Sequence, residues 1–147
     1  MNITRNILHS WYRSKGARTV ADVQRLAASE FGLKLTADKV VKILHDQIPR
    51  EQWYQTRIIA AVKQIFPGSF VRKMSAGVYS ESGFPDVLVI YDGLYIGLEV
   101  KRPFLGVPSP LQISTIKEIQ KAGGVAAIVH MPEEAVDLVN FAMEDIQ

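Results

Sequence analysis

Apolar residues recur at helical spacing along the first fifty residues of the chain. The pattern predicts three helices separated by short turns, over residues 4–15, 20–31 and 37–46. The turns carry residues that commonly end or begin helices, namely Gly16, Thr19, Gly32 and Thr36. In the third helix we expect four apolar residues to face inward: Val40, Val41, Ile43 and Leu44. Such closely spaced helices are typical of a helix-turn-helix module that contacts DNA; the alternative is three helices that cap the following domain.

After a junction at Ile48-Pro49-Arg50, helical and strand patterns alternate. The expected order is helix, three strands, helix, strand and helix. The segments are 51–65, 70–76, two strands within 83–101, 111–122, 125–130 and 132–146. We therefore predict an α/β (α+β) fold with two domains, a helical module at 1–50 and a larger domain at 51–147.

The two strands within 83–101 are joined by Asp92-Gly93, a strong signal for a two-residue hairpin turn. This turn pairs Tyr91 with Leu94, Val89 with Ile96 and Val87 with Leu98. The next pair is Asp86 with Glu99, and Lys101 lies two residues further on the same face. The hairpin thus brings two carboxylates and an ammonium together at its open end.

Two carboxylates at this separation repel each other unless one is protonated or a cation lies between them. Oxygen ligands without nitrogen or sulfur favour a hard cation such as Mg²⁺ or Mn²⁺. Lys101 is placed either to neutralise one carboxylate or to face a phosphate and an attacking water. The alternative is an ordinary salt bridge from Lys101 to Glu99 or Asp86 at the end of a strand.

Composition excludes several other kinds of site. The chain contains no cysteine, so it has neither disulfides nor thiolate zinc sites. Its three histidines, His9, His45 and His130, lack the spacing of metal ligands. The polar N-terminus lacks the apolar run of a signal peptide, and no stretch approaches the roughly 18 apolar residues of a membrane span. We therefore expect a cytoplasmic protein that does not contact a membrane.

The net charge of +2 conceals an asymmetry along the chain. Residues 1–50 carry nine Lys or Arg and four Asp or Glu, a net charge of +5, whereas residues 51–147 carry eight and eleven, a net charge of −3. A basic module attracts a polyanion, and an acidic one holds cations. The lysines on or near the third helix, Lys34, Lys39 and Lys42, are the candidate DNA contacts of the first module. Chance placement of a few charges gives the same sums.

The motifs GFPD at 83–86 and EVK at 99–101 resemble the signature of the PD-(D/E)XK nucleases. The surrounding residues are similar to the VRR-NUC branch of that superfamily, from about residue 51 to residue 130. They are Glu51, Tyr54-Gln55, Ile58, Val71-Arg72, Gly77, Gly97-Leu98, Ser109-Pro110-Leu111-Gln112 and Gly123-Gly124. The resemblance implies a mixed sheet flanked by helices and metal-dependent hydrolysis of a phosphodiester. Small members of the superfamily resemble Holliday-junction resolvases and act as homodimers.

The resemblance also implies roles for individual residues. Asp86, Glu99 and the backbone carbonyl of Val100 would be metal ligands, and Lys101 would orient or help activate the water. Glu51 would complete the metal site, and Gln112 is the motif glutamine. Arg72 also matches the family and would contact nucleic acid. Two further candidate contacts come from the residues themselves: Lys73, which alternates with Arg72 along the strand and would be solvated or on DNA, and Arg102, which could form a phosphate clamp with Lys101.

Some of these residues have simpler explanations. Glu51 stands in the first turn of a helix, where the dipole favours an acid, and Gln55 one turn later is a rival for its role. Gln112 forms a capping box with Ser109, which does not prevent it from also pointing at a phosphate.

These features together predict a Mg²⁺- or Mn²⁺-dependent endonuclease that hydrolyses DNA, with branched DNA such as a Holliday junction as the expected substrate. The expected partners are DNA and a second copy of the chain, with no small-molecule cofactor. Two alternatives stay open. The chain could be a helix-turn-helix DNA-binding protein whose nuclease core is an inactive dimerisation scaffold, or a restriction-type or RNA nuclease that uses the same chemistry.

Overall fold

The computed structural model describes residues 2–74 and 83–145 of the chain. They pack as two compact units. The helical unit contains Met1–Pro49 and Arg102–Gly106, and the sheet unit contains Arg50–Lys101 and Val107–Gln147. Among the described helices, none combines the length and apolar character that a membrane span needs.

The helical unit contains α1 (Arg5–Lys15), α2 (Val20–Phe31) and α3 (Ala37–Gln47), which confirms the three predicted helices. Each begins at a threonine whose hydroxyl accepts a hydrogen bond from a backbone N–H of the first turn. In α3, Val40 and Leu44 are fully buried, but Val41 is 39% exposed. The expectation that Val41 faces inward was wrong. Neighbouring helical residues point about 100° apart, so burying the Val40–Leu44 stripe turns Val41 outward.

A short segment that follows Lys101 in sequence packs with the helical unit. Arg102 donates hydrogen bonds from Nε to the carbonyl of Pro49 (2.9 Å) and from Nη2 to that of Ile48 (2.8 Å). Phe104 packs edge-on against Tyr12, with ring centroids 5.9 Å apart. The chain therefore passes between the two units after Pro49, after Lys101 and after Gly106.

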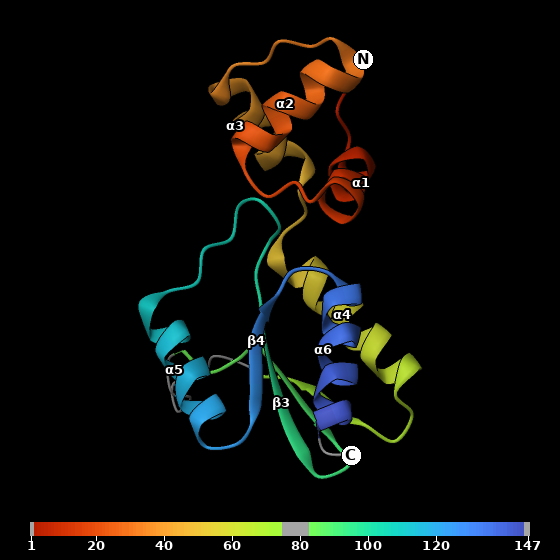
Figure 1. The fold of residues 1–147 in the computed structure, drawn as a ribbon, viewed down its shortest axis with the longest axis vertical. Helices are drawn as coiled ribbons and strands as arrows, with labels where there is room; N and C mark the ends of the chain where they lie inside the picture. The colour runs from red at the N-terminus through yellow and green to blue at the C-terminus, as the bar shows by residue number, and fades with distance from the viewer. Residues whose placement is uncertain (1, 75–82, 146–147) are drawn as a thin grey trace. The chain divides into compact units, whose positions relative to one another are not determined.

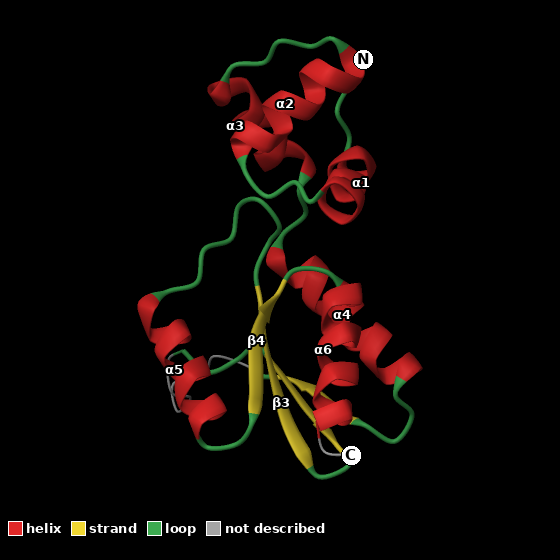
Figure 2. Ribbon diagram, in the orientation of Figure 1, coloured by secondary structure: helices red, strands yellow, loops and turns green. Residues whose placement is uncertain are grey.

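The sheet unit has the predicted order of helices and strands. Its elements are α4 (Glu51–Ile65), β1 (Phe70–Lys73), β2 (Val87–Tyr91), β3 (Leu94–Val100), α5 (Pro110–Lys121), β4 (Val125–Val129) and α6 (Pro132–Asp145). The four strands form one sheet in the order β1-β2-β3-β4, antiparallel except for the parallel pair β3–β4. Helices α4 and α6 cover one face, and α5 lies on the other (Figures 1 and 2). This mixed α/β sheet flanked by helices confirms the expected fold class.

The hairpin register is the one predicted. Tyr91 pairs with Leu94, Val89 with Ile96 and Val87 with Leu98. Asp92 and Gly93 both have positive φ, 50° and 79°, which is the backbone of a tight hairpin turn. The ladder ends at Val87, so Asp86 lies just outside the paired strands.

The core of the sheet unit lies between the sheet and the helices α4 and α6. Apolar residues alternate along the strands toward these helices, and they pack on apolar residues of α4 and α6. Its fully buried members include Tyr54, Ile58, Val62, Val87, Val89, Ile96, Leu98, Val100, Ala135 and Val139. The opposite face carries Glu99, because strand residues alternate between faces. A rigid core on one face of the sheet thus supports the polar site on the other.

Candidate active site at the open end of the β2–β3 hairpin

The packing of Pro85 on β3 positions the next residue, Asp86. A Cβ added at Gly97 would lie 2.9 Å from the Pro85 ring and 2.8 Å from the Tyr95 hydroxyl. Glycine at this position therefore lets Pro85 lie directly on β3. The close contact places the following residue, Asp86, beside the end of β3, where Glu99 projects.

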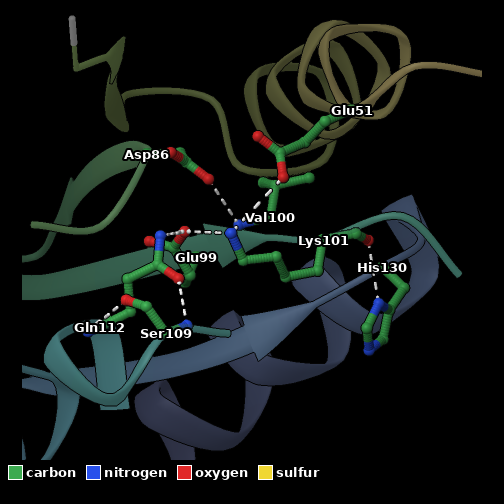
Figure 3. A network of polar contacts seen from close by, with 8 residues as sticks. All are labelled: Glu51, Asp86, Glu99, Val100, Lys101, Ser109, Gln112 and His130. Atoms are coloured by element: carbon green, nitrogen blue, oxygen red, sulfur yellow. Dashed lines mark hydrogen bonds and ion pairs between the residues drawn. The ribbon is translucent and has the colours of Figure 1, made fainter. Parts of the chain in front are cut away.

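Asp86 is bound to β3 through its side chain rather than through the strand ladder. Its Oδ2 accepts a hydrogen bond from the backbone N–H of Val100 at 2.9 Å (Figure 3). In a strand, the N–H and C=O of one residue point the same way. The Val100 carbonyl therefore points toward the Asp86 side of β3, as its implied role as a metal ligand requires.

Glu99 is the most deeply buried acid described, with 1% of its surface exposed. Its Oε1 accepts a hydrogen bond from Gln112 Nε2 at 2.7 Å and lies 3.3 Å from Lys101 Nζ. Its Oε2 is buried and has no hydrogen-bond partner among the described residues. The pKa of Glu99 is raised to about 7, first because burial penalises the charged form and next because of the nearby charge of Asp86, while Lys101 opposes the shift.

Lys101 lies between two acids that come from different elements. Its Nζ is 3.3 Å from Glu99 Oε1 and 3.6 Å from Oε1 of Glu51, the first residue of α4 (Figure 3). The Lys101 side chain is only 13% exposed, whereas that of Glu51 is 37% exposed. Of the two α4 candidates, Glu51 reaches the ammonium, while Gln55 is buried one turn further along the helix.

Gln112 has two contacts at the start of α5. Its Oε1 accepts from the backbone N–H of Ser109 at 2.8 Å, and its backbone N–H donates to Ser109 Oγ at 3.1 Å, which completes the capping box. The side-chain Nε2 is then directed at Glu99. The cap and the contact with the site are therefore made by one side chain.

The donor set fits a hard divalent cation. Asp86 and Glu99 offer adjacent carboxylates, and the carbonyl of Val100 points toward the Asp86 side of β3. The Oε2 of Glu99 is a buried acceptor without a donor among the described residues. Across residues 2–74 and 83–145, no three His, Cys, Asp or Glu side chains cluster as a complete metal site. Side chains alone therefore supply two ligands, and a cation would need backbone, water or phosphate oxygens besides.

Two of the candidate nucleic-acid contacts lie on β1. Arg72 stands opposite Leu88 and so shares the sheet face of Glu99, whereas Lys73 stands opposite Val87 on the other face. The Arg72 guanidinium lies over the Phe70 ring, 4.3 Å from its centroid.

The other candidates belong to the helical unit. The guanidinium of Arg102 already binds two backbone carbonyls, and the lysines Lys34, Lys39 and Lys42 are exposed. Gly77, which contributed to the sequence resemblance, lies outside the described residues.

The structure also brings one residue to the site that the sequence did not indicate. His130 follows β4, and its Nδ1 lies 2.9 Å from the backbone carbonyl of Lys101 (Figure 3). The positions of the three histidines in the sequence lack metal-ligand spacing and give no sign of this contact. The parallel pairing of β3 with β4 places His130 beside Lys101, although the two are 29 residues apart.

Comparisons with known proteins identify the fold. No protein-family model matches the chain, and no curated protein matches it. A solved structure described as a VRR_NUC domain protein matches with a TM-score of 0.51 at 13% identity, covering 64% of this chain and 88% of that one. Another, described as a VRR_NUC domain, is 29% identical, covers 59% of this chain and 95% of that one, and has a TM-score of 0.49. The match with the TM-score of 0.51 shows that this part of the chain has the fold of a VRR_NUC domain, the family that the GFPD and EVK motifs resemble.

Proposed function

We propose that the chain is a Mg²⁺- or Mn²⁺-dependent endonuclease that hydrolyses DNA, with branched DNA as its substrate. The observation that carries the proposal is the environment of Glu99. It is a fully buried acid beside a second acid, and one of its oxygens has no partner among the described residues. A buried polar atom without a partner costs about 1–3 kcal/mol, so either a proton shared with Asp86 or a bound cation is expected at that oxygen. A cation ligand needs such an oxygen.

Each residue of the cluster has a role in this proposal. Asp86, Glu99 and the Val100 carbonyl would hold the cation, which when bound polarises the phosphodiester and lowers the pKa of a bound water. Gln112 holds the Glu99 carboxylate in one orientation through its hydrogen bond. The Nζ of Lys101 carries positive charge and N–H donors to the place where negative charge develops on the phosphate. Glu51 holds the ammonium from the other side.

The choice of branched DNA as the substrate rests on the sequence resemblance and on the positive charge of the helical unit. That unit would bind the phosphates through its exposed lysines, so binding should weaken steeply with salt. The resemblance also implies a homodimer, which would present two sites to two strands. Sedimentation of the protein with and without junction DNA measures this stoichiometry.

One experiment tests the proposal directly. A four-way junction, a flap, a splayed arm, linear duplex, single-stranded DNA and RNA are incubated with Mg²⁺, Mn²⁺ or EDTA. We expect metal-dependent cutting, fastest on a branched DNA. Lys101→Ala should reduce cutting by about a hundredfold or more, because one positioned charge donor is worth roughly that factor. The control Lys63→Ala removes an exposed lysine at the far end of α4 and should cut normally.

A second readout follows the metal rather than the cutting. Mn²⁺ should raise the melting temperature of the unaltered protein, because a ligand that binds only the folded state stabilises it. Asp86→Asn should abolish this rise. A protein that cuts none of the six substrates, and that Mn²⁺ does not stabilise, would contradict the proposal.

The second candidate function is DNA binding without cleavage. One observation favours it: Lys101 already forms ion pairs with Glu99 and Glu51, and the described part of the chain has no cluster of three metal-binding side chains. Salt-sensitive binding of the same DNA panel without cutting would establish this alternative.

A further inference from the structure

We infer that His130 is a positioning residue for Lys101, acting through a hydrogen bond from its ring to the Lys101 backbone carbonyl. The inference rests on the proposed function, because it concerns Lys101 as part of an active site. The contact is 2.9 Å long and lies within the sheet unit (Figure 3). A carbonyl oxygen only accepts hydrogen bonds, so the Nδ1 of His130 must carry the proton.

The hydrogen-bond pattern of the sheet explains why a side chain is needed here. In the parallel register, Val100 pairs with Val129, and the N–H of Lys101 donates to the Val129 carbonyl at 3.0 Å. The next bond of the ladder would join the Lys101 carbonyl to the N–H of Met131. That N–H instead donates to Glu134 Oε1 at 2.9 Å, at the start of α6. The His130 ring thus replaces the missing strand partner of Lys101.

This replacement bears on the position of the Lys101 ammonium. Lys101 is the first residue beyond β3, and the chain enters the helical unit directly after it. Its N–H is bound to Val129 and its carbonyl to His130, so two consecutive hydrogen bonds hold the backbone of Lys101 on its β4 side. The direction of its side chain is therefore fixed before the ammonium meets Glu99 and Glu51. Misplacing a reacting group by about 1 Å can cost about a hundredfold in rate.

A purely structural role of this histidine is separable from the positioning role. The backbone N–H of His130 also donates to Glu134 Oε1 at 2.8 Å, which helps to begin α6. Substitution of the side chain leaves that backbone bond in place. A substitution series can therefore test the ring while the start of the helix is kept.

The test compares three variants in DNA cleavage. Asn places an amide N–H near the position of Nδ1, whereas Gln places it near Nε2, and Ala provides none. We expect His130→Asn to keep kcat within about threefold of the unaltered protein. His130→Gln and His130→Ala should lower kcat by about 10- to 100-fold with little change in KM or DNA affinity. Normal kcat in His130→Ala, or an equal loss in all three variants, would overturn the inference.

Two further outcomes separate this inference from the proposed function. If the unaltered protein cuts no substrate in either metal, the proposed function fails, and the positioning role fails with it. If it cuts, nitrogen NMR of ¹⁵N-histidine decides the contact without relying on variants. The neutral His130 ring should be protonated at Nδ1. Protonation at Nε2 alone would overturn the inference, because an unprotonated Nδ1 cannot donate to the Lys101 carbonyl.

Discussion

At the scale of single residues, Glu99 controls the electrostatics of the site. Burial and the neighbouring Asp86 both raise the pKa of Glu99, and Lys101 opposes them without cancelling the shift. A carboxyl in this position is protonated easily in the absence of a cation. Binding a divalent cation would require the ionised form, so metal binding at this site would release a proton.

The raised pKa of Glu99 predicts how the stability of the metal-free protein depends on pH. Folding raises the pKa of Glu99 from 4.5 to about 7. Its favourable contribution is therefore fully present below about pH 4.5 and is lost as the pH rises through about 7, with a slope of at most about 1.4 kcal/mol per pH unit. Urea unfolding in EDTA measures this slope. Glu99→Gln should remove the contribution of Glu99 to this slope.

The matched control for the stability measurement is Glu118→Gln. Glu118 is an exposed acid on α5, so its substitution should leave the slope as it is in the unaltered protein. Identical slopes in the unaltered protein and in Glu99→Gln would show that Glu99 does not titrate in this range.

At the scale of elements, the first turn of α5 combines helix capping with support of the site. Ser109→Ala removes only the hydroxyl of the capping box, which should cost about 1 kcal/mol of stability and leave cleavage within a few fold. Gln112→Ala removes part of the cap and also the hydrogen bond to Glu99, so it should lose both stability and activity. Urea unfolding and cleavage rates of the two variants check this. Equal activity in both variants would mean that Gln112 only caps the helix.

Elements differed in how far the sequence could predict them. The β2–β3 hairpin was predicted residue by residue, because a two-residue turn at Asp92-Gly93 fixes the register of the strands that it joins. The connection between β3 and β4 contains α5, so no short turn fixes the register in which these two strands pair. The contact of His130 with Lys101 therefore could not be predicted. Glu51 was expected at the site only through the family resemblance, since its contact with Lys101 depends on how α4 packs on the sheet.

At the scale of the whole molecule, the basic charge and the acidic site belong to different parts of the chain. The described structure divides at Pro49, close to where the charge changes sign. The binding of Arg102 to the carbonyls of Ile48 and Pro49 was not predictable from the sequence. The segment 102–106 belongs to the helical unit, although the residues before and after it belong to the sheet unit. The lysines on or near α3 are exposed and available to phosphates.

The assignment of DNA binding to the helical unit predicts a specific salt dependence. Changing Lys34, Lys39 and Lys42 together to Gln should weaken junction binding and reduce the slope of log affinity against log salt by up to about 3, since each phosphate contact contributes about 0.9. Fluorescence anisotropy over a salt series measures both quantities. The control changes Arg13, Lys15 and Arg25, exposed cations of α1 and α2, to Gln. It removes the same charge from the same unit, so an equal loss of slope in the control would show that net charge, and not the α3 surface, binds DNA.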